Sequence, residues 1–172
     1  MVTGAGGLGQ MAIQILRALS ATTQIVAVDT APDKLEVATR MGADEVLLSG
    51  EDAVRRILEI TRGQGAELVL YVVGVNATLQ MGARVSRVLG HLTIAGLGGG
   101  ALPVNFNSPA HECSVASPFW GALPELLEVV ELAQAGKITM LVEHFPLERA
   151  AEAYQLLHDG KINGRAVITP ND

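Results

Sequence analysis

The strongest constraint on the fold is a glycine-rich turn that follows a very short apolar start. The chain opens MVTGAGGLGQMAIQILRAL, in which Gly4, Gly6 and Gly9 match the spacing G-x-G-x-x-G. Between a strand and a helix, the first glycine permits a tight turn and the second lets the backbone approach a bound group. The third lets the helix pack closely on the sheet. The apolar pattern over residues 8–20 predicts that helix.

Strand-like segments alternate with helix-like segments along most of the chain. After the opening strand in MVTG, strands are expected at residues 23–29, 44–48, 66–74, 91–98 and 113–118. Helices are expected at residues 8–20, 32–41, 49–63, 76–90 and 123–136. This order predicts an α/β fold, a doubly wound parallel sheet of Rossmann type. Residues 140–170 read as strand, helix and strand, which either extends the sheet or forms a second layer.

Composition and charge exclude several classes of protein. A length of 172 residues suffices for one well-buried domain, and 49% hydrophobic against 17% charged residues indicates a globular chain. The net charge of −6 and the lack of a Lys/Arg cluster argue against a nucleic-acid partner. No apolar run reaches the ~20 residues of a membrane span. A single cysteine, Cys113, excludes an internal disulfide, and a cytoplasmic location is expected.

An acidic residue stands where a ribose-binding carboxylate is expected. Asp29 ends the predicted strand 23–29 and lies 20 residues after Gly9. A carboxylate there accepts hydrogen bonds from the adenosine ribose and repels the 2′-phosphate of NADP, so NAD is favoured. The plainer alternatives are a purely structural glycine turn and a capping role for Asp29. An S-adenosylmethionine site uses a similar turn on a different sheet order, but the second glycine-rich strand end at residues 94–100 favours a dinucleotide.

No constellation of catalytic or metal-ligating residues is visible. The four histidines, His91, His111, His144 and His158, are scattered and show no zinc-ligand spacing. We therefore expect no metal ligand among these histidines.

Five segments stand out together: VTGAGGLGQMAIQILRAL, VDTAPDKLEVATRMGADEVL, YVVGVNATL, GHLTIAGLGG and SPFWGALPELLEVVELAQAGKI. In this order they resemble the cofactor half of medium-chain, zinc-dependent alcohol dehydrogenases, and most of all the bacterial NAD-dependent secondary-alcohol dehydrogenases. The resemblance implies an oxidoreductase that moves hydride between NAD and an alcohol or ketone. It divides the chain into a Rossmann dinucleotide-binding domain, residues 1–137, with a truncated first strand, and a C-terminal segment, residues 138–172, that in the family packs on the catalytic domain.

The resemblance also implies roles for individual residues. The glycine turn would hold the pyrophosphate, and Asp29, paired with Lys34, would hold the adenosine ribose. The full set of implied cofactor-binding residues is Gly4, Gly6, Gly7, Leu8, Gly9, Asp29, Lys34, Val72, Val73, Ala95, Leu97, Phe119 and Arg165. Trp120 is implied as a wall of the alcohol pocket, with a core or interface aromatic as the alternative. Tyr71 departs from the family, which usually has an acidic residue there, and this puts a local hydrogen bond in doubt.

In the resembling family the zinc ligands lie upstream of the glycine turn, and this sequence does not contain them. Zinc is therefore expected only in a full-length parent, and this chain alone is expected to be inactive. Three alternatives remain open: a fragment of a full enzyme, a non-catalytic NAD-binding module, and a zinc-free reductase of quinone-oxidoreductase type. The third is opposed by Asp29, because those enzymes generally prefer NADPH. Strand 113–118 is expected at the sheet edge, where the family dimerises, which predicts a homo-oligomer through this edge.

Overall fold

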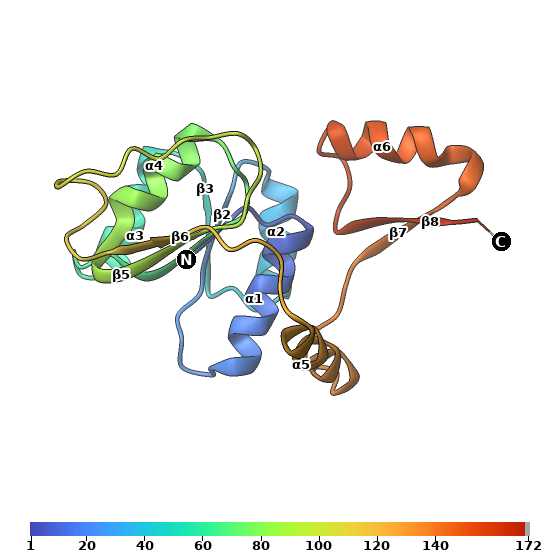
Figure 1. Cartoon of the computed structure of the whole chain (residues 1–172), viewed down its shortest axis with the longest axis horizontal. Helices are drawn as coiled ribbons and strands as arrows, with labels where there is room; N and C mark the ends of the chain where they lie inside the picture. The colour runs from blue at the N-terminus through green and yellow to red at the C-terminus, as the bar shows by residue number, and fades with distance from the viewer. Residues whose placement is uncertain (171–172) are drawn as a thin grey trace.

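The computed structural model describes residues 1–170 and consists of a six-stranded part and a smaller tail (Figure 1). The sheet is parallel, with its strands in the order β3-β2-β1-β4-β5-β6. Its strands are β1 (Val2–Thr3), β2 (Val26–Asp29), β3 (Glu45–Leu48), β4 (Ala66–Tyr71), β5 (Ser86–Ile94) and β6 (Ser114–Ala116). The helices of the six-stranded part are α1 (Gly7–Leu19), α2 (Pro32–Arg40), α3 (Glu51–Ile60), α4 (Asn76–Val85) and α5 (Leu123–Gln134). The predicted doubly wound fold is confirmed, and this strand order is that of dinucleotide-binding domains.

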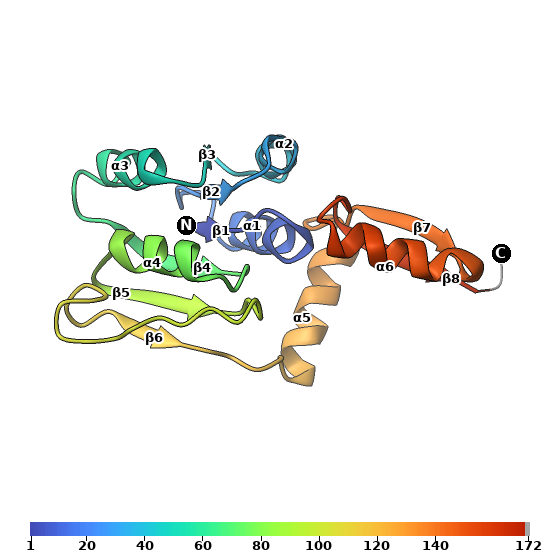
Figure 2. The ribbon, with the colours of Figure 1, turned by 90° about the horizontal axis from the view of Figure 1, so that it is seen from above.

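Helices cover both faces of the sheet, as Figure 2 shows with α1 and α2 on one side and α3 and α4 on the other. On the first face Ile13 of α1 and Ala38 of α2 pack against buried residues of β1 and β2. On the second face Ile57 of α3 and Leu79 of α4 pack against β4 and β5. Burial from both sides explains why the central strands read as continuous apolar runs. None of the helices in residues 1–170 is long and apolar enough to cross a membrane.

One predicted helix is wrong over its last third, residues 86–90. Residues 76–90 were expected to be helical, but α4 ends at Val85 and β5 begins at Ser86. The Ser86 hydroxyl donates to the Gly82 carbonyl oxygen at 2.8 Å, and Ser86 pairs with Ala66 of β4. Leu89 then takes a φ of 58°, which no helix accommodates. Sheet pairing therefore overrides the helical pattern of this segment.

The tail, defined here as residues 138–170, forms a sheet of its own. It contains β7 (Val142–Pro146), the 3₁₀ turn η1 (Leu147–Arg149), α6 (Ala150–His158) and β8 (Arg165–Thr169). β7 and β8 pair in parallel, and Phe145, Ala153 and Ile162 make a small separate core. Figure 2 shows this layer beyond α1 and α5, so the tail does not extend the six-stranded sheet.

Asp44 joins α1 to the start of β2. Its Oδ2 accepts a hydrogen bond from the backbone N–H of Ile25 at 2.7 Å and from Arg17 Nη2 at 2.6 Å. The Ile25 N–H, and after it the Arg17 guanidinium, lower the pKa of Asp44 below its usual value. The carboxylate is partly exposed, so solvent screens the pair.

This lowered pKa predicts a pH-dependent effect of Asp44→Asn. The contribution of the charge to stability is present above the unfolded-state pKa of about 3.9 and is lost as pH falls through the lower folded-state value. We expect Asp44→Asn to reduce the free energy of unfolding by about 0.5–1 kcal/mol at pH 7, an amount discounted for exposure. Urea unfolding at pH 7 and pH 3 measures it, and an equal loss at both values would contradict the account.

Candidate functional site

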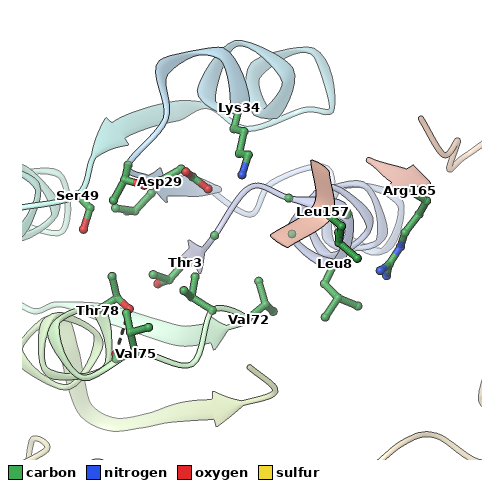
Figure 3. Close-up of a pocket in the computed structure, with 17 residues that line it drawn as sticks. Thr3, Leu8, Asp29, Lys34, Ser49, Val72, Val75, Thr78, Leu157 and Arg165 are labelled. Carbon is green, nitrogen blue, oxygen red and sulfur yellow. Dashed lines mark hydrogen bonds between the residues drawn. The ribbon is translucent and has the colours of Figure 1, made fainter. Parts of the chain in front are cut away.

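A cavity of about 610 Å³ opens at the carboxyl edge of the sheet, between β1 and β4 where the strand order reverses. In open parallel sheets, ligands bind at such a switch point. Figure 3 shows its walls, which come from the glycine turn, the ends of β2 and β4, α4 and the tail. Its lining residues are Thr3, Gly4, Gly6, Gly7, Leu8, Gly9, Val28, Asp29, Thr30, Lys34, Ser49, Val72, Val73, Val75, Thr78, Leu157 and Arg165.

The glycines of the turn differ in what surrounds them. Gly4 has a φ of +95°, and a Cβ there would lie 2.6 Å from Val73 Cγ2. A Cβ on Gly9 would overlap the carbonyl group of Gly4, so α1 packs directly on the turn. A Cβ on Gly6 would meet no atom within 4 Å and would stand in the cavity. The turn thus brings bare backbone to the cavity at Gly6, which suits a ligand that must approach it closely.

The first turn of α1 lines this cavity and has no capping side chain. Gly6 caps the helix without a side-chain hydrogen bond, and no acidic residue lies in the first turn. The first intrahelical bond of this turn runs from the Gln10 N–H to the Gly6 carbonyl oxygen at 2.9 Å. The preceding N–H groups have no partner within the helix, and the positive end of its dipole favours an anion.

Asp29 lies at the end of β2 and bridges the two loops beside the cavity. Its Oδ2 accepts the Ala5 N–H at 2.7 Å, and its Oδ1 accepts the Ala31 N–H at 3.0 Å. Each carboxylate oxygen can accept a further hydrogen bond. Asp29 therefore both holds the glycine turn in place and offers acceptors to a ligand.

Lys34 does not pair with Asp29 as predicted. Among residues 1–170 no ion pair joins them, although both line the cavity, and Figure 3 shows the Lys34 amine directed into it. The first turn of α2 places Lys34 above the cavity, and the hydrogen bonds that Asp29 accepts come from two backbone N–H groups. With Arg165 on the far side, the lining carries two cations and one anion, a balance that suits an anionic ligand.

Tyr71 supports the wall formed after β4. Its ring is fully buried, and its hydroxyl donates to the Val75 carbonyl oxygen at 2.7 Å and lies 2.8 Å from Thr78 Oγ1. At the position where the family usually has an acidic residue, the local hydrogen bonds of this chain are those of a phenol. It ties β4 to the start of α4, where Val75 and Thr78 line the cavity.

The structure brings ten of the predicted cofactor-binding residues to one cavity. They are Gly4, Gly6, Gly7, Leu8, Gly9, Asp29, Lys34, Val72, Val73 and Arg165. The other predicted residues, Ala95, Leu97, Phe119 and Trp120, lie outside its lining. The Leu97, Phe119 and Trp120 side chains are 93%, 84% and 84% exposed. These three contribute no wall to the cavity in residues 1–170.

Sequence reasoning missed several lining residues, namely Thr3, Val28, Thr30, Ser49, Val75, Thr78 and Leu157. Thr3 ends β1, and Thr30 and Ser49 directly follow β2 and β3. Their position at the carboxyl edge of the sheet is a signal that could have found these three. Leu157 comes from α6 in the tail, far along the chain, and no local pattern indicates it.

Residues 1–170 contain no cluster of side chains that could form a metal site. No three His, Cys, Asp or Glu side chains within residues 1–170 converge so as to hold a metal ion. These residues therefore do not provide the ligands that a zinc ion needs, and zinc chemistry is not assigned to them.

The sequence and the fold both match known dehydrogenases. Residues 7–135 match the family model described as zinc-binding dehydrogenase. The chain is 37% identical over 176 residues to the NAD-dependent alcohol dehydrogenase of Sulfurisphaera tokodaii, covering 99% of this chain and 50% of that protein. It is 30% identical over 171 residues to the D-arabinose 1-dehydrogenase (NADP(+)) of Saccharolobus solfataricus, covering 99% and 49%.

A solved structure with the same fold is that of the alcohol dehydrogenase from Aeropyrum pernix. It superposes with a TM-score of 0.90 at 33% identity, over 98% of this chain and 49% of that one. The chain thus spans about half the length of the curated relatives it matches.

Proposed function

The chain belongs to the family of zinc-binding dehydrogenases, and on this premise we propose that it is the NAD-binding half of an alcohol dehydrogenase. The observation that carries the proposal is the cavity in which the bare glycine turn, the start of α1 and Asp29 meet. When bound, NAD supplies a nicotinamide that exchanges hydride with an alcohol or ketone. The residues of this chain that line the cavity bind and orient that cofactor.

The geometry supports a particular placement of the dinucleotide. The pyrophosphate lies over Gly6, Gly7 and Leu8, where N–H groups at the start of α1 face the cavity. Arg165 faces the same turn from the tail and supplies a positive charge to the phosphates. The adenosine ribose lies at Asp29, with Lys34 beside it but not paired to it.

The nicotinamide end extends toward Ala95, Leu97 and Phe119, and Trp120 forms part of an alcohol pocket. Because these residues lie outside the cavity lining, we propose that further polypeptide completes this end of the site. The relatives are about twice as long as this chain, which supports that arrangement. The catalytic zinc of the family is then held by residues outside those described here, and the substrate pocket lies mostly outside them as well.

We also propose a homo-oligomer built through the edge strand β6, within the predicted segment 113–118. β6 is the last strand of the sheet, and its Ser114 and Val115 are exposed. Unpaired backbone groups at such an edge pair readily with a second copy. The boundary between residues 1–137 and 138–172 and a cytoplasmic location stay predictions of the same proposal.

Fluorescence titration with NADH and NADPH, on wild type and Asp29→Asn, tests the proposed function. Wild type is expected to bind NADH at least about tenfold more tightly than NADPH, because the Asp29 carboxylate repels the 2′-phosphate. In Asp29→Asn the preference is expected to fall to about twofold, since the charge is removed and one acceptor oxygen remains. Asp33→Asn is the matched control, because Asp33 is an exposed acid of α2 outside the cavity lining. Equal NADH and NADPH affinities in wild type would refute the assignment to NAD.

A further inference from the structure

Gln14 is a buried amide on α1 that binds the tail at two points. Its Nε2 donates to the Thr139 carbonyl oxygen at 2.8 Å, and its Oε1 accepts the Thr139 N–H at 2.8 Å. The side chain is 7% exposed, so these bonds are shielded from water on the helix side. An amide facing a backbone peptide in this way forms a bridge that resembles a short piece of sheet ladder.

This bridge is the polar connection between the two parts of the molecule. Within residues 1–170, every hydrogen bond that joins the tail to the six-stranded part runs between Gln14 and Thr139. β7 and β8 pair only with each other in the same range. Gln14 therefore supplies the hydrogen bonds between the tail and α1.

The tail closes over the glycine turn a short distance away. A Cβ on Gly7 would lie 2.7 Å from the Gly164 carbonyl oxygen and 2.9 Å from Arg165 Nε. The Arg165 N–H donates to the Leu141 carbonyl oxygen at 2.9 Å, and Leu141 lies two residues after Thr139. A continuous set of contacts thus runs from Gln14 through Thr139 and Leu141 to Arg165, whose side chain lines the cavity (Figure 3).

We propose that Gln14 is a positioning residue for the dinucleotide: it fixes the tail on α1 so that the Arg165 guanidinium stays over the start of that helix. The inference rests on the proposed function, since it needs a phosphate-bearing ligand in the cavity. Gln14 touches no ligand in this arrangement and is outside the cavity lining. Its effect on binding passes through the tail residues that line the cavity, Leu157 and Arg165, and of these only Arg165 carries a charge for the phosphates.

A double-mutant cycle on NADH binding tests the inference, with Gln14→Met, Arg165→Ala and the double variant compared with wild type. Methionine keeps the length and helix preference of glutamine, and water can replace the lost bonds because Thr139 is exposed. Arg165→Ala is expected to weaken NADH binding about tenfold or more, as for a lost charged hydrogen bond. Gln14→Met is expected to weaken it about fivefold in wild type but less than about twofold in Arg165→Ala.

Two further readouts separate positioning from a general loss of stability. Adenosine, which has no phosphate, is expected to bind wild type and Gln14→Met equally. The decline of NADH affinity with salt is expected to become shallower in Gln14→Met, because one cation no longer faces the phosphates. Ile57→Val, a core variant of α3 far from the tail, is the control for destabilisation and is expected to leave NADH affinity unchanged.

The outcomes distinguish the positioning role of Gln14 from the NAD-binding function itself. Non-additive losses in the cycle, with adenosine binding unchanged, support the positioning role. Additive losses, or a Gln14→Met variant with wild-type NADH affinity, overturn it while the proposed function stands. A wild-type chain that binds no NADH overturns the proposed function and this inference together.

Discussion

Gly9→Ala is expected to prevent stable folding of the whole six-stranded part. The new Cβ would overlap the Gly4 carbonyl group, and both backbones are fixed, one in α1 and the other by the hydrogen bond from the Gly4 N–H to the Val28 carbonyl oxygen at 2.7 Å. Relief of this overlap requires α1 to move away from β1, which breaks the packing of Ile13 and its neighbours. We expect the free energy of unfolding to fall by about 4 kcal/mol or more, as it does for severe defects in a protein core.

Urea unfolding followed by circular dichroism measures this loss. Gly82→Ala is an informative companion, because its Cβ would approach Val69 Cγ1 to 3.3 Å, a side chain that can adjust. It is expected to change the free energy of unfolding by less than about 1 kcal/mol, since the helix gain offsets the crowding. A Gly9→Ala chain as stable as wild type would show that the turn does not need glycine for packing.

Gly6→Ala is expected to fold with the stability of wild type but to bind NADH only weakly. The backbone of Gly6 has φ −73° and ψ −162°, a region open to alanine, and no atom lies within 4 Å of the new Cβ. That open space is where the pyrophosphate must approach the backbone, so the methyl group displaces it. We expect the Kd for NADH to rise by about 100-fold, equivalent to about 3 kcal/mol.

The two glycine variants separate packing from binding within one motif. Fluorescence titration gives the affinity of Gly6→Ala, and its urea midpoint serves as the internal control for folding. If Gly6→Ala bound NADH like wild type, the pyrophosphate would have to lie elsewhere. The same variant losing its stability would show that Gly6 acts in the fold and not in the site.

Features that depend on neighbouring residues in the sequence, such as the glycine turn and the end of β2, were predictable from the sequence. The glycine spacing and the position of Asp29 placed the turn and the β2 end correctly, because backbone sterics restrict both. The order of strands and helices then determined the doubly wound sheet, since parallel strands need crossover connections of one hand.

What could not be predicted depends on contacts between distant segments. Residues 86–90 carry a helical pattern, but Ser86 pairs with Ala66 and the helix ends early. Asp29 accepts two backbone N–H groups, and Lys34 is directed into the cavity without pairing with it; only the folded loops reveal this arrangement. Gln14 reads as an ordinary helix residue until Thr139, 125 positions later, is brought against it.

The central claim is that the start of α1 and the end of β2 bind the pyrophosphate and ribose of NAD. Titration of the ¹⁵N-labelled chain with ADP-ribose, followed by amide chemical shifts, tests it most directly. We expect large shifts at Gly6, Gly7, Leu8 and Asp29, and unchanged amides in β3 and on the exposed face of α5. A saturating titration that moves none of these four amides, or that moves a distant set instead, would contradict it.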